Sequence, residues 1–405
     1  MVKAMDNNYL FKGNFGLERE TLRIDSNGCL ATTPHPFRNN KNLERDFCEN
    51  QLEIITPVCG SIEELMTSLT KLDVYARKVI AKDGEYLWIN SNPPHFDSED
   101  EICIASYDGA MSFKYDYRLK LQRRYGKRLM LLSGIHFNFS FADEFLKSMY
   151  NGDNFDEFKN NMYFRLSKQV FRYSWLLVLL SAASPVYDLS LLDGNSKSDK
   201  YASLRNSVKG YWNQFVPILD YTDLNSYVSS VNRYIEKGAL FSAGELYLPV
   251  RLKAHSGSGL DSILYEGINH IELRMFDLNP LSPIGIFRED LDFAHYLMLY
   301  LINLPDFEFT EELQEAAVKN HQSAALYDLS EIKINGYNAA DAAIGLLDDM
   351  QEYFKQYDNV LANIKFQKNK ITNNERYCVK INKLLSDNFQ NVMLDISKNG
   401  CMLDV

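Results

Sequence analysis

The sequence predicts an α+β fold, in which a strand-rich first part is followed by a helical last part. Polar and apolar residues alternate, with the period of a half-buried strand, in segments of the first 140 residues and again at His270–Asp277. Beyond Asn279-Pro280 the pattern is helical almost to the end of the chain. Strands and helices do not alternate, which argues against a parallel βαβ design.

The individual elements follow from these periods and from the residues that start and stop them. Strands are expected at Phe15–Ile24, Phe47–Thr56, Arg128–Phe141 and His270–Asp277. Helices are expected at Ser61–Lys82, Phe113–Tyr125 and Asn154–Ser181, the last ending before Ser184-Pro185. Residues 184–215 are rich in Ser, Asn, Gly and Lys and predict a long loop, which in a compact protein is often functional.

No internal repeat and no Pro/Gly/Ser-rich linker divides the chain. We therefore expect residues 1–405 to form a single domain, with a strand-rich core at about 13–290 and a helical region at about 290–405.

Composition excludes several classes of protein. The net charge is −11 and there is no basic block, which argues against a nucleic-acid partner. The longest apolar run, Trp175–Ala183, is far shorter than the roughly 20 residues needed to cross a membrane. The first residues, Met1–Asn8, lack an apolar signal core. The six cysteines are scattered without a C-x-x-C pair, which favours a reducing cytoplasm.

Carboxylates gather on two of the expected strands. Glu18 and Glu20 lie two residues apart in G-L-E-R-E-T-L-R and share a strand face, and Glu53 lies on another strand with Glu49 and Gln51. Each acid alone is compatible with an ordinary solvated surface, which we favour for Glu49. Asp46 falls on the opposite side of a straight strand from Glu53, and it joins that residue only if it precedes the strand or a bulge intervenes.

Two further strands place polar residues opposite a row of apolar ones. In S-G-I-H-F-N-F-S, His136 and Asn138 face away from Ile135, Phe137 and Phe139, which is at least as typical of a cavity lining as of a hydrogen-bonded histidine in the core. Imidazole can ligate a divalent metal or hydrogen-bond a substrate.

In H-I-E-L-R-M-F-D, Glu272 and Arg274 lie together, opposite Ile271, Leu273 and Met275. They are either a structural ion pair or a metal ligand beside a phosphate clamp. No phosphate loop, dinucleotide-binding turn or nucleophile elbow occurs. A bound nucleotide would therefore rely on metal ions held by carboxylates.

Together these segments resemble the bacterial glutamate–cysteine ligase family, which catalyses the first step of glutathione synthesis. The resemblance runs in collinear order over roughly residues 13–290. It rests on these segments: Gly16–Arg23, His35-Pro36, Asp46–Pro57, Tyr117-Arg118 through Arg124–Gly126, Ser133–Ser140, Ser203–Tyr211, Glu245–Tyr247, Ile271–Pro280 and Ile284–Ile286. Val208 and Lys209 depart from the family pattern.

The resemblance implies a glutamine synthetase-like fold with a curved antiparallel sheet, packed helices and a helical C-terminal region. It implies ATP as co-substrate and Mg²⁺, with Mn²⁺ as a substitute, on Glu18, Glu20, Asp46, Glu53, His136 and Glu272. It assigns transferred phosphate to the catalytic Arg274, and substrate contacts to Tyr117, Asn138, Arg205, Tyr211 and Tyr247, the tyrosines forming the cysteine pocket.

The implied substrates are L-glutamate, L-cysteine and ATP. A chain of this length has no room for the second domain of fused glutathione-making enzymes, so a separate glutathione synthetase is expected downstream. Three other hypotheses remain: a γ-glutamyl ligase for a different amine, a metal-dependent hydrolase that works without ATP, and a catalytically silent binding protein.

Overall fold

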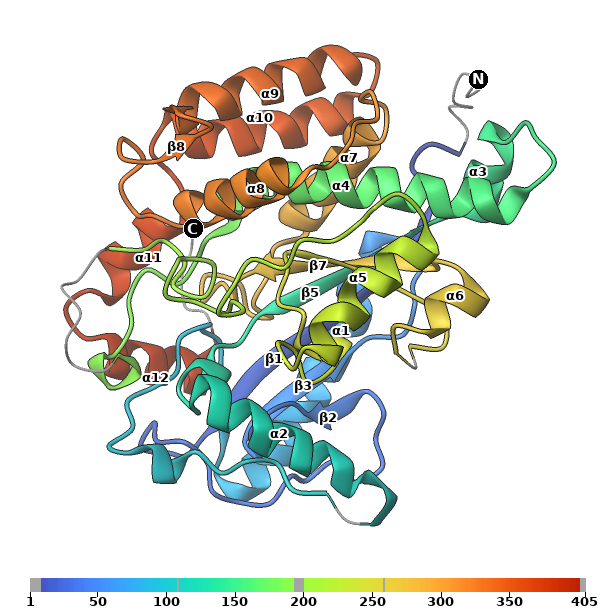
Figure 1. The fold of residues 1–405 in the computed structure, drawn as a ribbon. Helices are drawn as coiled ribbons and strands as arrows, with labels where there is room; N and C mark the ends of the chain where they lie inside the picture. The colour runs from blue at the N-terminus through green and yellow to red at the C-terminus, as the bar shows by residue number, and fades with distance from the viewer. Residues whose placement is uncertain (1–8, 108, 193–199, 258, 401–405) are drawn as a thin grey trace.

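The structure, a computed structural model, describes residues 9–107, 109–192, 200–257 and 259–400. Its centre is an antiparallel sheet with the strand order β2-β3-β1-β5-β7-β6, and β4 pairs with the end of β1 (Figure 1). The strands are β1 Gly13–Ile24, β2 Leu43–Arg45, β3 Gln51–Ile55, β4 Tyr86–Trp88, β5 Ile135–Phe141, β6 Val250–Lys253 and β7 His270–Phe276. The predicted α+β fold with an antiparallel sheet is confirmed.

Helices surround the sheet. They are α1 Ile62–Ile80, α2 Ser112–Tyr125, α3 Asp143–Met149, α4 Phe155–Ser181, α5 Leu224–Glu236, α6 Ser262–Glu266, α7 Arg288–Leu301, α8 Glu311–Ala324, α9 Ala339–Tyr353, α10 Asp358–Thr372, α11 Tyr377–Leu385 and α12 Phe389–Asn399. Figure 1 shows α9 and α10 side by side at one end of the molecule and α2 at the other, with the sheet between them. A short hairpin of β8, Lys333–Ile334, and β9, Tyr337–Asn338, precedes α9.

The apolar face of the sheet forms the main core. Phe137 and Phe139 of β5 are fully buried there, beside Ile271 and Leu273 of β7 and the apolar side of α4. The same alternation that buries these residues turns the even-numbered residues of β1, β5 and most of β7 to the opposite face. That second face carries the polar side chains predicted from the sequence.

The predicted strand Arg128–Phe141 is wrong in its first half. Leu129–Leu131 form a 3₁₀ turn and β5 begins only at Ile135. Met130 and Leu131 are buried in a second, smaller core under α2. The apolar residues that suggested a strand here are therefore core residues of a turn.

The strand predicted at Phe47–Thr56 likewise begins at Gln51, because Cys48–Gln51 form a turn closed by the Gln51 N–H on the Cys48 carbonyl. The predicted strand at His270–Asp277 ends one residue early, at Phe276. The strands β2, β4 and β6 are three or four residues long and were not predicted, since such short segments show no period.

Several sequence predictions lie outside what the structure tests. The segment Met1–Asn8 and Cys401 fall outside the described residues, as do residues 193–199 of the predicted loop. The single-domain organisation stays a prediction. Within the described ranges, no helix combines the length and apolar character that a membrane-spanning segment requires.

Candidate active site

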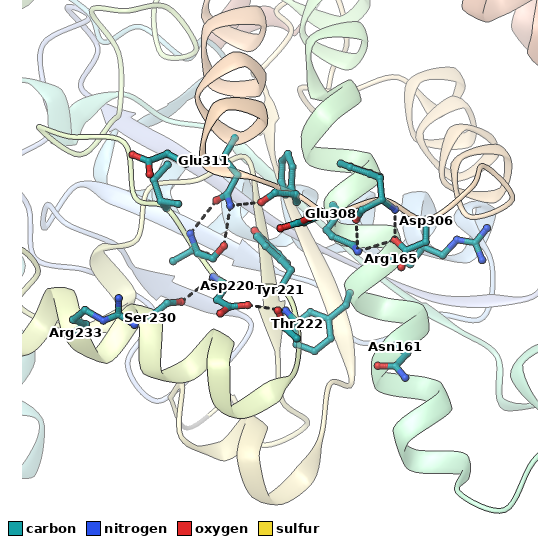
Figure 2. Close-up of a pocket in the computed structure, with 17 residues that line it drawn as sticks. Asn161, Arg165, Asp220, Tyr221, Thr222, Ser230, Arg233, Asp306, Glu308 and Glu311 are labelled. Atoms are coloured by element: carbon teal, nitrogen blue, oxygen red, sulfur yellow. Dashed lines mark hydrogen bonds and ion pairs between the residues drawn. The ribbon is translucent and has the colours of Figure 1, made fainter.

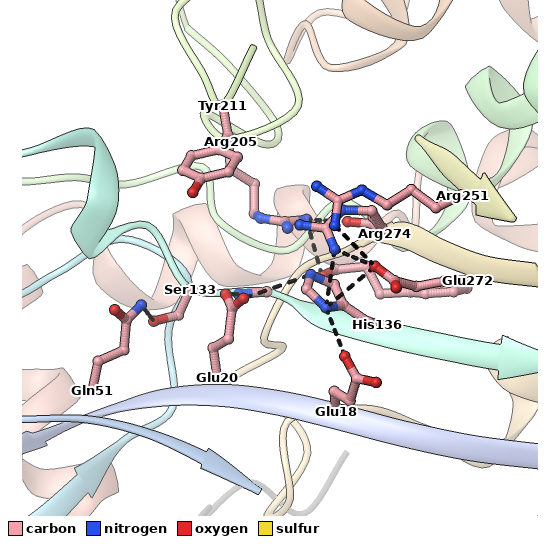
Figure 3. Close-up of polar contacts among 12 residues, drawn as sticks. Glu18, Glu20, Gln51, Ser133, His136, Arg205, Tyr211, Arg251, Glu272 and Arg274 are labelled. Carbon is pink, nitrogen blue, oxygen red and sulfur yellow. Dashed lines mark hydrogen bonds and ion pairs between the residues drawn. The ribbon is translucent and has the colours of Figure 1, made fainter. Parts of the chain in front are cut away.

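Cross-strand register gathers the predicted polar residues on one face of the sheet. Three directly opposed pairs define it: Glu18 with His136, Glu20 with Glu53, and Asn138 with Glu272. Directly opposed residues of an antiparallel pair point to the same side of the sheet. Four strands, β3, β1, β5 and β7, therefore contribute to a single polar surface (Figure 3).

Glu18, His136 and Glu272 form a group with the spacing of metal ligands. One ligand atom from each lies within 4.8 Å of the others. His136 Nδ1 lies 3.3 Å from Glu18 Oε2 and 3.9 Å from Glu272 Oε1, and Figure 3 shows both carboxylates directed at the ring. The Asn138 amide donates to the other oxygen of Glu18 at 3.1 Å, which orients that carboxylate.

The protonation states in this group suit metal binding. Burial, together with the charge of Arg274, lowers the pKa of His136 to about 4, so the imidazole is neutral at pH 7. Burial alone would raise the pKa of Glu18 and Glu272. The hydrogen bond from His136 reverses this for Glu18, and the charges of Lys253 and Arg274 reverse it strongly for Glu272. A neutral imidazole between two ionised carboxylates is a competent ligand set.

A second acidic group joins Asp46 to Glu20 and Glu53. Asp46 comes directly after β2, and its N–H donates to the Gln51 carbonyl at 3.0 Å, so it precedes β3 and escapes the alternation of a straight strand. Burial and then the charge of Asp46 raise the pKa of Glu20 to about 8, and the same two causes raise the pKa of Glu53 well above its ordinary value. Adjacent carboxylates that hold protons at neutral pH form a site which a divalent cation can occupy instead.

Glu49, for which the sequence favoured an ordinary surface role, lies outside this group. Its carboxylate accepts the His35 N–H at 2.9 Å and forms an ion pair with Arg45 at 3.0 Å. These contacts stabilise the turn before β3.

Arg274 lies at an irregularity in the pairing of β7 with β5. The register between β5 and β7 shifts between Ile135 and Phe137, so that Phe276 lies opposite Ile135 and Leu273 opposite Phe137. Arg274 lies within this bulge, forms an ion pair with Glu272, and places Nη1 3.4 Å from His136 Nδ1. Met275 and Phe276 are both buried, so the simple alternation predicted for this strand ends at the bulge.

Arg205 lies beside Arg274 at the edge of the same face. Its Nη1 donates to the Arg274 carbonyl at 2.9 Å and to the Phe276 carbonyl at 3.3 Å. Its guanidinium packs against Gly134, where an added Cβ would lie 2.1 Å from Nη2. Only glycine leaves room for Arg205 here, and the Gly134 N–H also donates to Glu20 at 2.7 Å.

Two cations on β6 also face the site and were not predicted from the sequence. Lys253 forms an ion pair with the fully buried Glu272, and Arg251 Nη1 lies 3.9 Å from the same carboxylate. The alternation V-R-L-K is the only signal of these residues in the sequence, and it is too short to indicate a strand. The face is therefore polarised, with acids toward β2 and β3 and cations toward β7 and β6.

The three tyrosines assigned to the acceptor pocket come from separate segments. The rings of Tyr211 and Tyr247 are 4.2 Å apart, beside a cavity of about 30 Å³ that Arg205 and Arg274 also line. Tyr117, on α2, places its hydroxyl 3.5 Å from where a Cβ on Gly244 would lie. The two departures from the family pattern, Val208 and Lys209, are exposed at the surface.

A larger cavity of about 880 Å³ lies elsewhere, between α4, α5 and the start of α8 (Figure 2). None of the predicted site residues lines it. Its Lys168 is already paired with Asp306 at 2.7 Å, and Gln314 bridges the carbonyls of Leu219 and Phe309. The converging acids and cations on the sheet, and not the larger cavity, therefore mark the candidate site.

The residues on the sheet fit a magnesium site. Oxygen donors dominate the set, and carboxylates with room for water and phosphate are the ligands that Mg²⁺ prefers. His136 Nε2 is buried without a hydrogen bond, 3.6 Å from Glu20 Oε1, and is a donor atom that Mn²⁺ also accepts.

Comparisons with known proteins agree with this geometry. The sequence matches the profile of the family described as glutamate–cysteine ligase over residues 1–241 and 235–324. It is 38% identical over 371 residues to the glutathione biosynthesis bifunctional protein GshAB of Listeria monocytogenes, covering 85% of this chain and 48% of that protein. It is 35% identical over 417 residues to the protein of the same name from Clostridium perfringens, covering 97% and 53%.

Solved structures share the fold. A bifunctional glutathione synthetase from Pasteurella multocida superposes with a TM-score of 0.87 at 26% identity, over 97% of this chain and 53% of that one. Glutamate–cysteine ligase from Francisella tularensis, solved in complex with AMP, superposes with a TM-score of 0.85 at 24% identity, over 96% and 88%. The chain spans about half the length of the curated relatives it matches. On the extent of these matches, the chain belongs to the glutamate–cysteine ligase family.

Proposed function

We propose that this chain joins the γ-carboxyl group of L-glutamate to the amine of L-cysteine, with ATP converted to ADP and phosphate, and so forms γ-glutamylcysteine. The observation that carries the proposal is the polarised sheet face. An acidic group of Asp46, Glu20 and Glu53 lies beside a basic group of Arg274, Arg251 and Lys253, with Glu18, His136 and Glu272 between them.

Such a face suits activation of a carboxylate by phosphoryl transfer. A carboxylate is a poor electrophile, and transfer of the ATP γ-phosphoryl group to it gives a γ-glutamyl phosphate that an amine can attack with loss of phosphate. Catalysis of phosphoryl transfer is chiefly positioning and neutralisation of charge. Arg274, held in place by Glu272, would stabilise the charge that grows on the transferred oxygens.

Glu18, Glu20, Asp46, Glu53, His136 and Glu272 would hold Mg²⁺, with Mn²⁺ as a substitute. The bound ions would supply positive charge between the carboxylates and the phosphates. His136 is already neutral and Glu18 and Glu272 are already ionised, so these three side chains need neither gain nor lose a proton to bind the metal.

The acceptor amino acid would lie against Tyr117, Tyr211 and Tyr247, with Asn138 and Arg205 as further substrate contacts. The rings of Tyr211 and Tyr247 would enclose the thiol side chain, which takes no part in the bond formed. A small pocket discriminates weakly against a near-isostere. We therefore expect 2-aminobutyrate to serve as an acceptor, and a strict need for a thiol would contradict this assignment.

Product identification tests the proposal. The chain is incubated with ATP, Mg²⁺, glutamate and an equimolar panel of amino acids, and products are identified by mass spectrometry. The expected product is γ-glutamylcysteine, formed together with ADP. A different γ-glutamyl amide would reassign the acceptor, and turnover without nucleotide would favour a hydrolase.

A separate glutathione synthetase and a cytoplasmic location complete the proposal. The curated relatives are named as bifunctional, so glycine is added to the same incubation. We expect γ-glutamylcysteine to accumulate without glutathione, whereas glutathione would show that the chain performs both steps. The five cysteines of the described residues are free thiols, as a reducing compartment requires.

A further inference from the structure

The segments that carry the three tyrosines meet at one buried residue, Glu245. Glu245 is fully buried in the turn that leads to Tyr247. Its Oε1 accepts hydrogen bonds from Arg124 Nη1 at 2.5 Å and from the Tyr125 hydroxyl at 2.7 Å, and its Oε2 accepts the Phe241 N–H. Arg124, Tyr125 and Glu245 are not among the proposed metal ligands or substrate contacts.

Arg124 fastens the end of α2 to this turn. Besides Glu245, its guanidinium donates to the Ala239 carbonyl at 2.7 Å and to the Gly238 carbonyl at 2.9 Å. It also lies 3.6 Å above the ring of Phe241. A guanidinium that is stacked on a ring and hydrogen-bonded through both terminal nitrogens is fixed in orientation as well as in distance. Since α2 carries Tyr117 two turns earlier, the contact sets the distance between that wall and the turn.

Asn213 connects the segment that carries Tyr211 to the same turn. Its amide donates to the Glu245 carbonyl at 2.7 Å and to the Tyr125 hydroxyl at 3.1 Å, while its Oδ1 accepts the Tyr247 N–H at 2.9 Å. Tyr211 lies two residues before Asn213, and the rings of Tyr125 and Tyr247 meet edge to face at 5.4 Å. Each tyrosine-bearing segment is therefore hydrogen-bonded to the same centre.

We propose that Arg124, Glu245 and Asn213 form a positioning network that sets the width of the acceptor pocket and thereby its preference for a small amino acid. The inference rests on the proposed function, since it concerns the acceptor of that reaction. The network touches none of the proposed metal ligands, so its loss should change acceptor binding and leave ATP and glutamate binding intact.

Steady-state kinetics with each substrate varied in turn tests the network. For Arg124→Met we expect the KM for cysteine to rise by about tenfold or more, because small displacements of positioning groups have effects of this size. The KM values for ATP and glutamate should stay within about twofold, which separates lost acceptor binding from general damage. Arg124→Lys, which keeps the charge but not the fork, should recover part of the loss.

Selectivity supplies a readout that a purely structural role would not move. In Arg124→Met, the ratio of kcat/KM for 2-aminobutyrate to kcat/KM for larger unbranched amino acids such as norvaline should fall by about tenfold, since a wider pocket rejects added methylenes less well. Arg123→Met is the matched control, because Arg123 is the exposed neighbour on the same helix turn. The control should match the wild type in every constant.

A milder variant keeps the test valid if Arg124→Met fails to fold. Tyr125→Phe removes only the hydroxyl that Glu245 and Asn213 share, and we expect a rise of about threefold to tenfold in the KM for cysteine, the size of one lost hydrogen bond. An unchanged KM for cysteine and unchanged selectivity in a folded Arg124→Met or Tyr125→Phe would overturn the proposal. Equal increases in all three KM values would overturn it as well.

The outcome is distinguishable from failure of the proposed function. If the wild-type chain makes no γ-glutamylcysteine, the proposed function fails by itself. The network is then measured without turnover, as the shift in melting temperature that 2-aminobutyrate produces in the presence of Mg²⁺ and an unreactive ATP analogue. A wild-type shift that Arg124→Met abolishes and Arg123→Met retains supports the network, and equal shifts in the two variants refute it.

Discussion

Glu20 on β1 lies directly opposite Glu53 on β3, and Glu53 in turn lies directly opposite Glu44 on β2. Burial and the neighbouring carboxylates raise the pKa of Glu20 and of Glu53, so the metal-free protein must hold protons on these groups at neutral pH. Asp46 adds a fourth carboxylate to the neighbourhood of Glu20 and Glu53. The free protein therefore carries an electrostatic cost at the place where the proposed reaction needs divalent cations.

Removing one of these acids should stabilise the metal-free protein. We expect Glu53→Gln to raise the melting temperature in EDTA, because the raised pKa of Glu53 means that the metal-free protein must take up a proton there when it folds at neutral pH, and glutamine needs none. Mg²⁺ at a hundredfold excess over its Kd should raise the free energy of unfolding of the wild type by about 2.7 kcal/mol. Glu53→Gln should lose most of this stabilisation. Thermal unfolding with and without Mg²⁺ measures both effects, with the exposed Glu236→Gln as control. A full Mg²⁺ response in Glu53→Gln would remove Glu53 from the metal site.

Replacing Arg274 should reduce turnover more than binding. We expect Arg274→Ala to lower kcat by about 10²–10³, the effect of removing one donor to a developing charge. Because Arg274 also lines the cavity beside Tyr211 and Tyr247, the KM for cysteine should rise as well, but by a smaller factor than the fall in kcat. ADP release at saturating substrates is the measurement, and Arg233→Ala on the exposed side of α5 is the control. Near-normal turnover in Arg274→Ala would refute the role.

Gly134→Ala should displace Arg205. The added Cβ would lie 2.1 Å from Arg205 Nη2, and overpacking of this kind costs about 1–3 kcal/mol. Gly345→Ala, in open space within α9, is the opposite case and should stabilise the protein by about 0.5–1 kcal/mol. Chemical unfolding compares the two variants. Opposite signs are expected, and a neutral Gly134→Ala would show that Arg205 moves aside at no cost.

His295 should make stability depend on pH below neutrality. The ring is buried against Phe15 and Phe139, and burial lowers its pKa from 6.5 to about 3. The unfolded chain takes up a proton near pH 6.5 while the folded protein stays neutral. The stability that the neutral His295 ring contributes is therefore fully present above pH 6.5 and is lost as the pH falls toward 3. Over that range the free energy of unfolding should fall by up to about 1.4 kcal/mol per pH unit.

Urea unfolding between pH 4 and pH 8 measures this slope. His295→Leu removes the titrating ring and keeps an apolar side chain in its place, so the slope below pH 6.5 should decrease by up to about 1.4 kcal/mol per pH unit. An unchanged slope in His295→Leu would assign the pH dependence to other groups.

Much of the site followed from local pattern. The two-residue spacing of Glu18 and Glu20, and of His136 and Asn138, correctly placed each pair on one strand face, because that period is set by the backbone alone. The positions of Asp46, Arg251 and Lys253 did not follow. Asp46 depends on the turn before β3, and the two cations lie on a strand of four residues.

The sequence by itself determined the class of the fold, the apolar face of the sheet and the acids that its strands carry, because side-chain alternation is a property of the local chain. Only the tertiary structure decided which strands became neighbours and which carboxylates came close enough to raise the pKa of another. It also decided that Glu245 would be hydrogen-bonded to Arg124 and Tyr125 of α2 and to Asn213. These relations depend on contacts between segments that can be more than a hundred residues apart in the sequence, and no local pattern encodes them.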